Sequence, residues 1–204
     1  MTSEVYAAIL AAGSASRFGS TKQLAEIDGT TLVVRATTIA NNVCADRTVV
    51  VAGHDAADVT EVLQGTQGFV VVNDGFAEGL GTSLARAVAS VSHVASAVIV
   101  MLADQPGINA HHLENLIDAW NDGDYDIVTT TFADTQGPPV LFSSTCFDEL
   151  RHLSGDAGGK HLFRDPRYRT ETIVFEPAAL DIDTEEDLES LRAARSNPTK
   201  SSRA

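Results

Sequence analysis

The stretch "EVYAAILAAGSASRFGSTK", residues 4–22, joins a short apolar run to a loop of small residues. A continuous apolar run of this length is typical of a strand that is covered on both faces of a sheet. Residues 11–13 carry almost no side chain, so their backbone N–H groups can approach a ligand closely, and Arg17 and Lys22 add two positive charges. The stretch therefore predicts a first strand followed directly by a loop that holds an anion.

Further apolar runs alternate with helical patterns along the chain. Between the runs, apolar residues recur every three or four positions, which predicts helices. The repeated order of strand and helix predicts an α/β fold, a three-layer αβα sandwich around a Rossmann-like, mostly parallel sheet. Residues 138–142 and 170–175 are less regular, and we expect a small antiparallel excursion there. The apolar runs after the first lie at residues 47–53, 69–73, 97–104 and 125–132.

Length and charge limit the domain organisation and the partners. A chain of 204 residues with 44% hydrophobic residues predicts one globular domain, residues 1–192, and a disordered basic tail, residues 193–204. Residues 1–191 hold 10 basic and 28 acidic residues, a formal charge of −18. Such a body repels nucleic acid and anionic membranes, so we expect neither as a partner. An anionic ligand would need a cation to mediate its binding.

Cysteine usage and the absence of targeting patterns indicate the compartment. Cys44 and Cys146 are far apart and lack ligand spacing, which favours neither a disulfide framework nor a zinc site. The sequence has no signal-peptide pattern and no apolar run long enough to cross a bilayer. We therefore expect a cytoplasmic protein that is neither exported nor embedded in a membrane.

The glycine-rich loop does not match two familiar phosphate-binding patterns. The dinucleotide fingerprint requires G-x-G-x-x-G, whereas Gly13 and Gly19 are six apart. A Walker A loop requires Gly-Lys-Ser/Thr at its end, whereas Ser20 and Thr21 separate Gly19 from Lys22. An NAD(P)-dependent oxidoreductase is disfavoured for this reason. A tight turn with solvated basic residues stays an alternative to phosphate binding.

Six segments in fixed order resemble the MobA-like nucleotidyltransferase family, and the resemblance spans residues 5 to about 192. The first, "LAAGSASRFGSTKQL", is similar to the signature of that family. Ala12 stands where guanylyl-transferring members usually have glycine, so the chain looks most similar to the branch of molybdenum cofactor cytidylyltransferases. The resemblance implies a fold of the nucleotide-diphospho-sugar transferase type. The segments lie at residues 10–24, 79–84, 101–106, 137–142, 155–160 and 181–188.

The resemblance also implies roles for individual residues. It implies Mg²⁺ as cofactor, held by Asp104 and Asp183, and catalytic roles for Arg17, Lys22 and Asp104. It implies nucleotide binding by Leu10, Ala11, Ala12, Gly13, Ser14, Arg17, Lys22, Gly79, Gly81, Ser83 and Asp104. It implies acceptor binding by Pro138, Pro139, Asp156 and Lys160.

The position of the acids can be interpreted without the resemblance. Asp104 closes the most apolar run, so we expect its carboxylate at the carboxyl edge of the sheet, where Mg²⁺ would take one or two carboxylates. A turn-capping role is the alternative. We expect Asp181 and Asp183 to point to opposite faces of a short extended segment, so that only one of them enters the cleft, and the resemblance implies that this one is Asp183. Asp187 completes a capping-box pattern with Thr184.

Two glycines and a lysine have structural alternatives to binding. Gly79 and Gly81 precede a helix that we expect to start near Thr82, so Thr82 or Ser83 can be an ordinary N-cap. Lys160 can be a solvated residue rather than a phosphate ligand.

Together these features predict a Mg²⁺-dependent nucleotidyltransferase. It would move a nucleoside monophosphate from a nucleoside triphosphate, CTP in preference, to the terminal phosphate of molybdopterin or molybdenum cofactor and release pyrophosphate. Guanylyl transfer from GTP and transfer to another small phosphate are alternatives. A non-catalytic carrier that hands molybdenum cofactor to an apo-molybdoenzyme is another.

Overall fold

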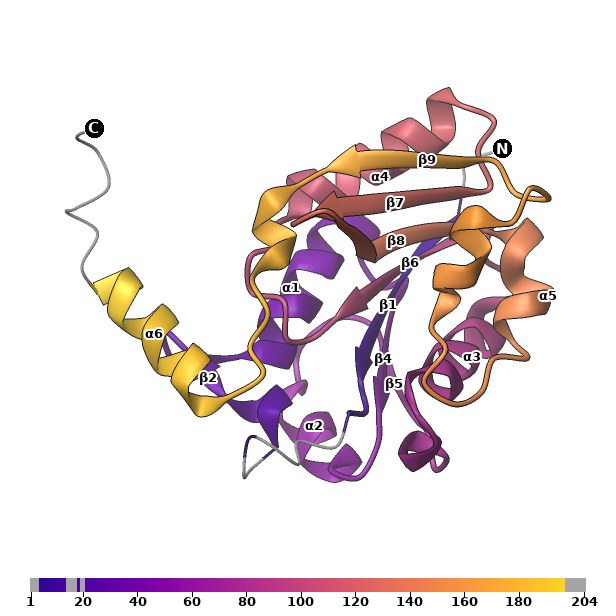
Figure 1. The fold of residues 1–204 in the computed structure, drawn as a ribbon. Helices are drawn as coiled ribbons and strands as arrows, with labels where there is room; N and C mark the ends of the chain where they lie inside the picture. Colours follow the sequence, from indigo (N-terminus) through magenta and orange to yellow (C-terminus); the bar gives the residue numbers. More distant parts are fainter. Residues whose placement is uncertain (1–3, 14–17, 19–20, 197–204) are drawn as a thin grey trace, which may run out of the picture.

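The computed structural model describes residues 4–13, 18 and 21–196 of the chain. Its centre is a seven-stranded sheet in the order β5-β4-β1-β6-β8-β7-β9 (Figure 1). Only β8 runs against its two neighbours, β6 and β7, and the other neighbouring strands are parallel. The predicted mostly parallel sheet with an antiparallel excursion is therefore confirmed, but the excursion is confined to residues 135–143, because residues 170–174 run parallel to their neighbour. The strands are β1 (Val5–Ala11), β4 (Thr48–Ala52), β5 (Phe69–Val72), β6 (Ala97–Leu102), β7 (Ile127–Phe132), β8 (Thr135–Ser143) and β9 (Thr170–Val174).

Helices cover both faces of this sheet. They are α1 (Leu32–Cys44), α2 (Ala56–Val62), α3 (Leu80–Val91), α4 (Ala110–Asp122) and α5 (Phe147–Leu150). Helix α6 (Glu185–Ser196) lies away from this sheet. Short 3₁₀ turns are η1 (Lys22–Leu24), η2 (Phe76–Glu78), η3 (Ser144–Cys146), η4 (Gly159–Arg164) and η5 (Glu176–Ala179). A separate two-stranded sheet pairs β2 (Glu26–Ile27) with β3 (Thr30–Thr31). Figure 1 shows α1 and α4 on one face of the large sheet and α3 and α5 on the other.

The alternation of side chains along β1 builds two cores. Ile9 packs with residues of α1 and α4, whereas its neighbours Ala8 and Leu10 pack with residues of α3 and α5. Successive side chains of a strand point to opposite faces, so a strand buried on both faces needs a continuous apolar run. Ile9 and Ile99 are fully buried, each contributing about 1.5–3 kcal/mol of burial free energy. The run at residues 4–10 therefore fixes β1 in the middle of the sandwich.

The last helix corrects the expected start of the tail. Helix α6 continues to Ser196, so residues 193–196 are helical rather than disordered. Arg192 donates to the Glu26 carbonyl and Arg195 pairs with Asp28 at 2.8 Å, which ties the helix to the β2–β3 hairpin. Arg195, one of the three basic residues of the expected tail, is therefore structural. Residues 197–204 lie outside the described part of the chain.

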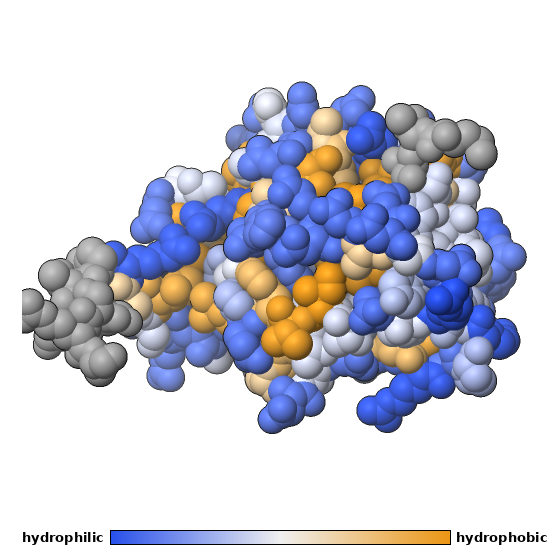
Figure 2. Space-filling model, turned by 90° about the horizontal axis from the view of Figure 1, so that it is seen from above, coloured by the Kyte–Doolittle hydropathy of each residue, from blue (hydrophilic) through white to orange (hydrophobic). Residues whose placement is uncertain are grey.

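The surface is mainly polar. Figure 2, seen from the side of β9, shows mostly hydrophilic residues with hydrophobic residues between them. Val174 of β9 is the most exposed of the large hydrophobic residues that the structure describes, at 68%. Within residues 4–13, 18 and 21–196, no helix has the length and apolar character needed to cross a membrane.

Candidate active site

A cleft of about 350 Å³ opens at the carboxyl ends of β1 and β6. Parallel strands end at the same edge of a sheet, so the loops that follow β1 and β6 meet there. We name it the β1–β6 cleft. It is lined by Leu10, Ala12, Gly13, Lys22, Gln23, Phe76, Ala77, Gly79, Leu80, Ser83, Leu102, Asp104 and Asp156.

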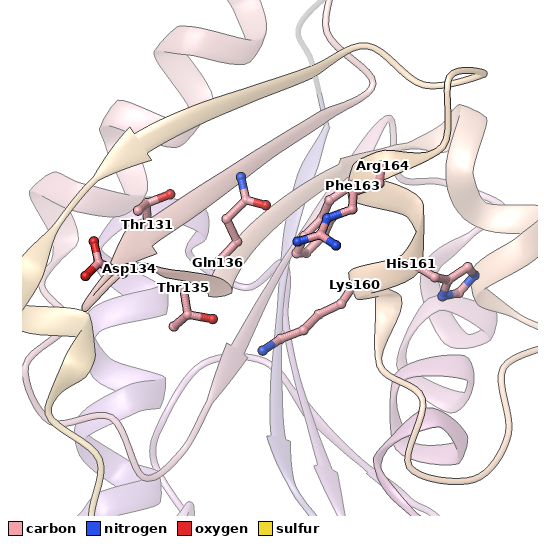
Figure 3. A pocket seen from close by; sticks show the side chains of 8 residues that line it. All are labelled: Thr131, Asp134, Thr135, Gln136, Lys160, His161, Phe163 and Arg164. Atoms are coloured by element: carbon pink, nitrogen blue, oxygen red, sulfur yellow. The ribbon is translucent and has the colours of Figure 1, made fainter.

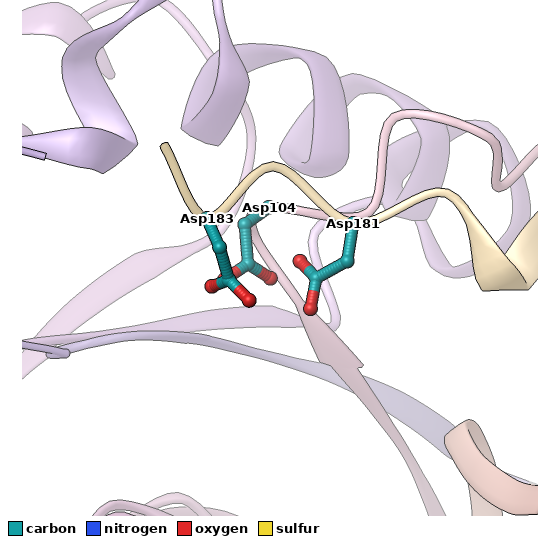
Figure 4. A group of neighbouring side chains, drawn as sticks. All are labelled: Asp104, Asp181 and Asp183. Atoms are coloured by element: carbon teal, nitrogen blue, oxygen red, sulfur yellow. The ribbon is translucent and has the colours of Figure 1, made fainter. Parts of the chain in front are cut away.

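Three carboxylates gather beside this cleft. One oxygen from each of Asp104, Asp181 and Asp183 lies within 4.8 Å of the others. Figure 4 shows the three side chains pointing toward one space, Asp104 from the end of β6 and the other two from the segment before α6. The Ile182 N–H donates to the Asp104 carbonyl at 3.1 Å and holds the two segments together. Parts of the chain almost 80 residues apart therefore supply one acidic cluster.

The expectation that Asp181 and Asp183 point to opposite faces is wrong, because both carboxylates lie in the cluster with Asp104. Ile182 is fully buried with Ile27, Leu32 and other apolar residues, so its side chain points away from the cluster. Residues i and i+2 of an extended segment share a face, which turns Asp181 and Asp183 to the same side. Asp181 was not predicted as a member of the cluster, because it was expected on the opposite face from Asp183.

Lys22 lies between two of these carboxylates. Its Nζ is 2.5 Å from Asp104 Oδ2 and 3.0 Å from Asp183 Oδ1. Burial lowers the pKa of Lys22, but the charges and hydrogen bonds of Asp104 and Asp183 outweigh burial and raise the pKa above its ordinary value. Partial burial raises the pKa of the Asp181 carboxyl to about 6, and the charges of Asp104 and Asp183 add to this effect. The cluster therefore holds more negative charge than Lys22 neutralises.

The donor set fits a divalent cation. Asp104 Oδ1 is buried and has no hydrogen-bond partner among the described residues. A buried acceptor without a partner costs about 1–3 kcal/mol, which coordination of a cation would remove. Carboxylate oxygens are the ligands that Mg²⁺ and Mn²⁺ prefer. Asp104, Asp181 and Asp183 are thus the residues that could hold such an ion.

Two glycines shape the wall of the cleft at the start of α3. The helix begins at Leu80, two residues before the expected start. Gly79 has a φ of 116°, and a Cβ there would lie 2.5 Å from Asp156 Oδ1. A Cβ on Gly81 would meet the Gly155 carbonyl oxygen at 2.9 Å. Both glycines are therefore required, because the 154–157 loop packs directly on the start of α3.

Hydrogen bonds hold the described residues on either side of positions 14–20. Gln23 Nε2 donates to the Gly13 carbonyl at 3.0 Å, which links η1 to the residues that follow β1. Thr21 Oγ1 donates to Asp55 Oδ2 at 2.7 Å, and His54 Nδ1 lies 2.7 Å from Asp55 Oδ1. The hydrogen bond from Thr21, and then that from His54, lowers the pKa of Asp55. The end of β4 therefore positions the residue that precedes Lys22.

A buried polar residue fastens α3 to the end of β5. Asn73 is 6% exposed, and its Nδ2 donates to Thr82 Oγ1 and to Ser83 Oγ at 3.0 Å each. Ser83 lines the cleft, but its hydroxyl already accepts a hydrogen bond from Asn73. No role was predicted for Asn73 or Asp55, because neither belongs to a motif that marks it as a binding residue.

A buried histidine lies apart from the cleft. His112 of α4 stacks on Phe175 with ring centroids 4.1 Å apart. Thr130 Oγ1 donates to the Pro139 carbonyl, so His112 Nε2–H donates to Thr130 Oγ1 at 2.8 Å. His112 Nδ1 is buried without a hydrogen-bond partner in the described residues. Burial, and then the nearby His111, lowers the pKa of His112 to about 4. The ring is therefore a neutral core residue.

The predicted site residues fall into four groups. Leu10, Ala12, Gly13, Lys22, Gly79, Ser83, Asp104 and Asp156 line the β1–β6 cleft, and Asp183 stands beside it. Ala11 and Gly81 are buried and do not line it. Pro138 and Lys160 line a neighbouring apolar cavity, whereas Pro139 does not. Ser14 and Arg17 lie outside the described residues.

The fold and the cleft define the class of α/β nucleotidyltransferases. Residues 7–172 match the model of the MobA-like NTP transferase domain, and the chain belongs to this family. The structure of an Rv0371c homologue from Mycobacterium sp. strain JC1 is 31% identical, with a TM-score of 0.81 and coverage of 97% of this chain and 100% of the other. Rv0371c of Mycobacterium tuberculosis H37Rv in complex with manganese is 29% identical, with a TM-score of 0.75 and coverage of 94% and 100%.

A curated relative is similar over part of its length. Purine catabolism protein PucB of Bacillus subtilis is 29% identical over 123 residues, which are 58% of this chain and 58% of PucB. The match thus spans less than two thirds of that relative.

Proposed function

We propose that this nucleotidyltransferase moves cytidine monophosphate from CTP to the terminal phosphate of molybdopterin or molybdenum cofactor and releases pyrophosphate. The observation that carries the proposal is the cluster of Asp104, Asp181, Asp183 and Lys22 beside a cleft at the carboxyl ends of β1 and β6. A cleft at that edge suits a nucleotide. The acids can hold the divalent cation that a triphosphate carries.

The transfer needs positioning and charge stabilisation more than covalent work by the protein. An oxygen of the acceptor phosphate would attack the α-phosphorus in line, and the bond from the α-phosphorus to the bridging oxygen of the β-phosphate would break. Pyrophosphate would leave with the electron pair of that bond. The backbone N–H groups of the loop after β1, with Arg17 and Lys22, would hold the β- and γ-phosphates.

A bound divalent cation would supply Lewis-acid stabilisation of the negative charge on the α-phosphate. Asp104, Asp181 and Asp183 would hold it. The manganese complex of the related Rv0371c supports a divalent cation in this branch of the family. Once this divalent cation neutralises Asp104 and Asp183, the Lys22 amine would be free to donate to phosphate oxygens.

The choice of CTP rests on the residue at position 12. Ala12 lies at the β1–β6 cleft, where guanylyl-transferring members of the family usually have glycine, and this difference favours CTP over GTP. Gly79 and Ser83 of the opposite wall would contact the base and ribose.

The test uses the purified full chain with CTP, GTP or ATP, each with Mg²⁺ or Mn²⁺ and with molybdopterin. Pyrophosphate release and the mass of the dinucleotide product are measured. We expect release with CTP and a cytidine dinucleotide product. Pyrophosphate release with GTP but not with CTP would overturn the choice of base. If none of the three nucleotides gave pyrophosphate, the proposed function would be overturned.

Two variants connect the activity to the acidic cluster. Asp104→Asn should lower turnover by about 100-fold or more, as loss of a group that stabilises the transition state does, and keep the unfolding midpoint. Asp46→Asn removes the same charge from an exposed turn outside the cleft and should leave turnover unchanged. An Asp104→Asn variant as active as the parent would remove Asp104 from the mechanism.

A further inference from the structure

A second cavity, of about 740 Å³, lies between the β7–β8 hairpin and η4. Thr135 and Gln136 of β8 line one side, and Lys160 and Arg164 of η4 line the other. Figure 3 shows the Lys160 amine reaching toward Thr135 and the Arg164 guanidinium lying beside Gln136, both over the same hollow. None of its lining residues belongs to the β1–β6 cleft.

The two cations of this cavity are left without counterions. The side chains of Lys160 and Arg164 have no ion pair or hydrogen bond with a described residue. In the same part of the chain, the side chains of Arg151, Arg167 and Arg169 all pair with carboxylates. The chain carries a formal charge of −14, so acids are abundant. Two unpaired basic side chains over one hollow therefore form an anion-binding surface.

The remaining charged lining residue does not cancel this surface. Asp134, the acid that lines the cavity, stands at the turn of the hairpin and forms no ion pair with Lys160 or Arg164. Figure 3 shows it at the far end from η4. The ring of His161 points away from the other side chains, with Nδ1 3.3 Å from the Gly158 carbonyl oxygen. The basic end of the cavity is thus formed by Lys160 and Arg164.

An apolar tract joins this cavity to the β1–β6 cleft. The tract shares Leu10, Leu80 and Leu102 with the cleft, and it shares Lys160 and Phe163 with the basic cavity. It encloses about 50 Å³, which is room for a slim or planar group. A ligand whose phosphate reacts in the cleft can therefore extend along the tract and reach η4 with its other end.

We propose that Lys160 and Arg164 bind a second negatively charged group of the acceptor, remote from the phosphate that reacts. The inference rests on the proposed function and narrows its substrate class. The acceptor is a phosphorylated compound with an apolar or planar middle and a further anionic group at its distal end. Arg164 suits such a group because a guanidinium donates two parallel hydrogen bonds to oxygen pairs, and Lys160 adds a point charge. Gln136 and Thr135 add neutral donors.

The first experiment detects the anion site without catalysis. Crystals of the full chain are soaked in tungstate, a tetrahedral oxyanion whose tungsten is located by anomalous scattering. We expect a tungsten peak within hydrogen-bond distance of Lys160 Nζ and the Arg164 guanidinium. The peak should be lost in the Lys160→Gln/Arg164→Gln variant and kept in Arg151→Gln, which removes an exposed, paired charge directly after α5. Absence of the peak, or a peak that persists in the double variant, would overturn the site.

The second experiment measures what the site does for the acceptor. With molybdenum cofactor as acceptor, whose metal–dithiolene group supplies an anionic group besides the phosphate, the double variant should raise the KM for the acceptor by about 10-fold to 100-fold, as loss of charge-assisted hydrogen bonds does, and leave the KM for the nucleotide within twofold. Arg151→Gln should leave both unchanged. An unchanged acceptor KM in the double variant would refute the assigned role. If no nucleotide is turned over, the proposed function fails, while the tungstate result still decides whether the anion site exists.

Discussion

Gly79→Ala should destabilise the protein strongly, because the added methyl group causes both backbone strain and overpacking. Gly79 has φ 116° and ψ 177°, a backbone region that is almost confined to glycine and costs about 1–3 kcal/mol for another residue. The added Cβ would also lie 2.4 Å from the Gly155 carbonyl carbon and 2.5 Å from its oxygen. Overpacking of this kind costs about 1–3 kcal/mol. The two costs sum to about 2–6 kcal/mol, a large part of the 5–15 kcal/mol that stabilises a typical domain.

Two further glycines separate these costs. Gly65 has a φ of 88° and open space around a would-be Cβ, so Gly65→Ala carries backbone strain alone. We expect it to cost about 1–2 kcal/mol. Gly81 lies in the first turn of α3, where its Cβ would meet the Ala157 and Gly155 carbonyl oxygens at 2.8 and 2.9 Å. Gly81→Ala therefore carries overpacking, partly offset by about 1 kcal/mol of helix propensity.

Equilibrium unfolding in urea gives the free energy of unfolding for each variant. Because 1 kcal/mol moves the midpoint of a domain of this size by roughly 2–4 °C, a loss of about 4 kcal/mol in Gly79→Ala should lower the thermal midpoint by roughly 8–16 °C. The loss should exceed that of Gly65→Ala by the overpacking cost. If Gly79→Ala were no less stable than Gly65→Ala, the 154–157 loop would not pack on the start of α3. The description of this wall of the cleft would then be wrong.

Three further results are expected. Lys22→Ala should weaken triphosphate binding by about 10-fold to 100-fold, yet tighten the binding of Mn²⁺ alone in electron paramagnetic resonance, since the amine competes for Asp104; weaker Mn²⁺ binding would contradict this. Asp55→Ala should raise the KM for the nucleotide by about fivefold at unchanged kcat, because a hydrogen bond of about 1 kcal/mol from Thr21 is lost; a fall in kcat alone would refute a positioning role. The unfolded chain protonates His112 near pH 6.5 and the folded chain only near pH 4, so stability should fall by about 3 kcal/mol as the pH drops through this window, and the pH slope in urea unfolding should flatten in His112→Gln; equal slopes would exclude His112 as the cause.

The sheet could be predicted from the sequence where burial on both faces forces a continuous apolar run. Strands β1, β4 and β6 are of this kind, and the small residues after β1 marked the loop at the carboxyl edge. The β7–β8 hairpin could not be predicted in the same way. Ala133 and Asp134 have φ values of 44° and 59° at its turn, a conformation for which the usual sequence signal is Asn-Gly or Asp-Gly. Without that signal, the residues of the basic cavity gave no sign that they meet.

The candidate site divides along the same line. Asp104 could be predicted because an acid at the end of a buried strand must emerge at the edge of the sheet. Its partners come from a segment that forms no strand, so their placement depends on where Ile182 finds its apolar cluster. Arg164 becomes visible as a binding residue only once the absence of a counterion is seen in the structure. Local patterns thus indicate single side chains, whereas their combination depends on long-range packing.

Charge ties these observations to one requirement of the reaction. Lys22 neutralises one of the three carboxylates in the cluster, so the cluster keeps a net negative charge when all three are ionised. A free triphosphate would be repelled from such a cleft, because charges a few ångströms apart in a partly buried site interact by several kcal/mol. A divalent cation offsets that repulsion locally, whatever the formal charge of −14 does at long range. The nucleotide should therefore enter as its complex with the cation, and Lys160 and Arg164 serve the end of the acceptor that such a cation does not reach.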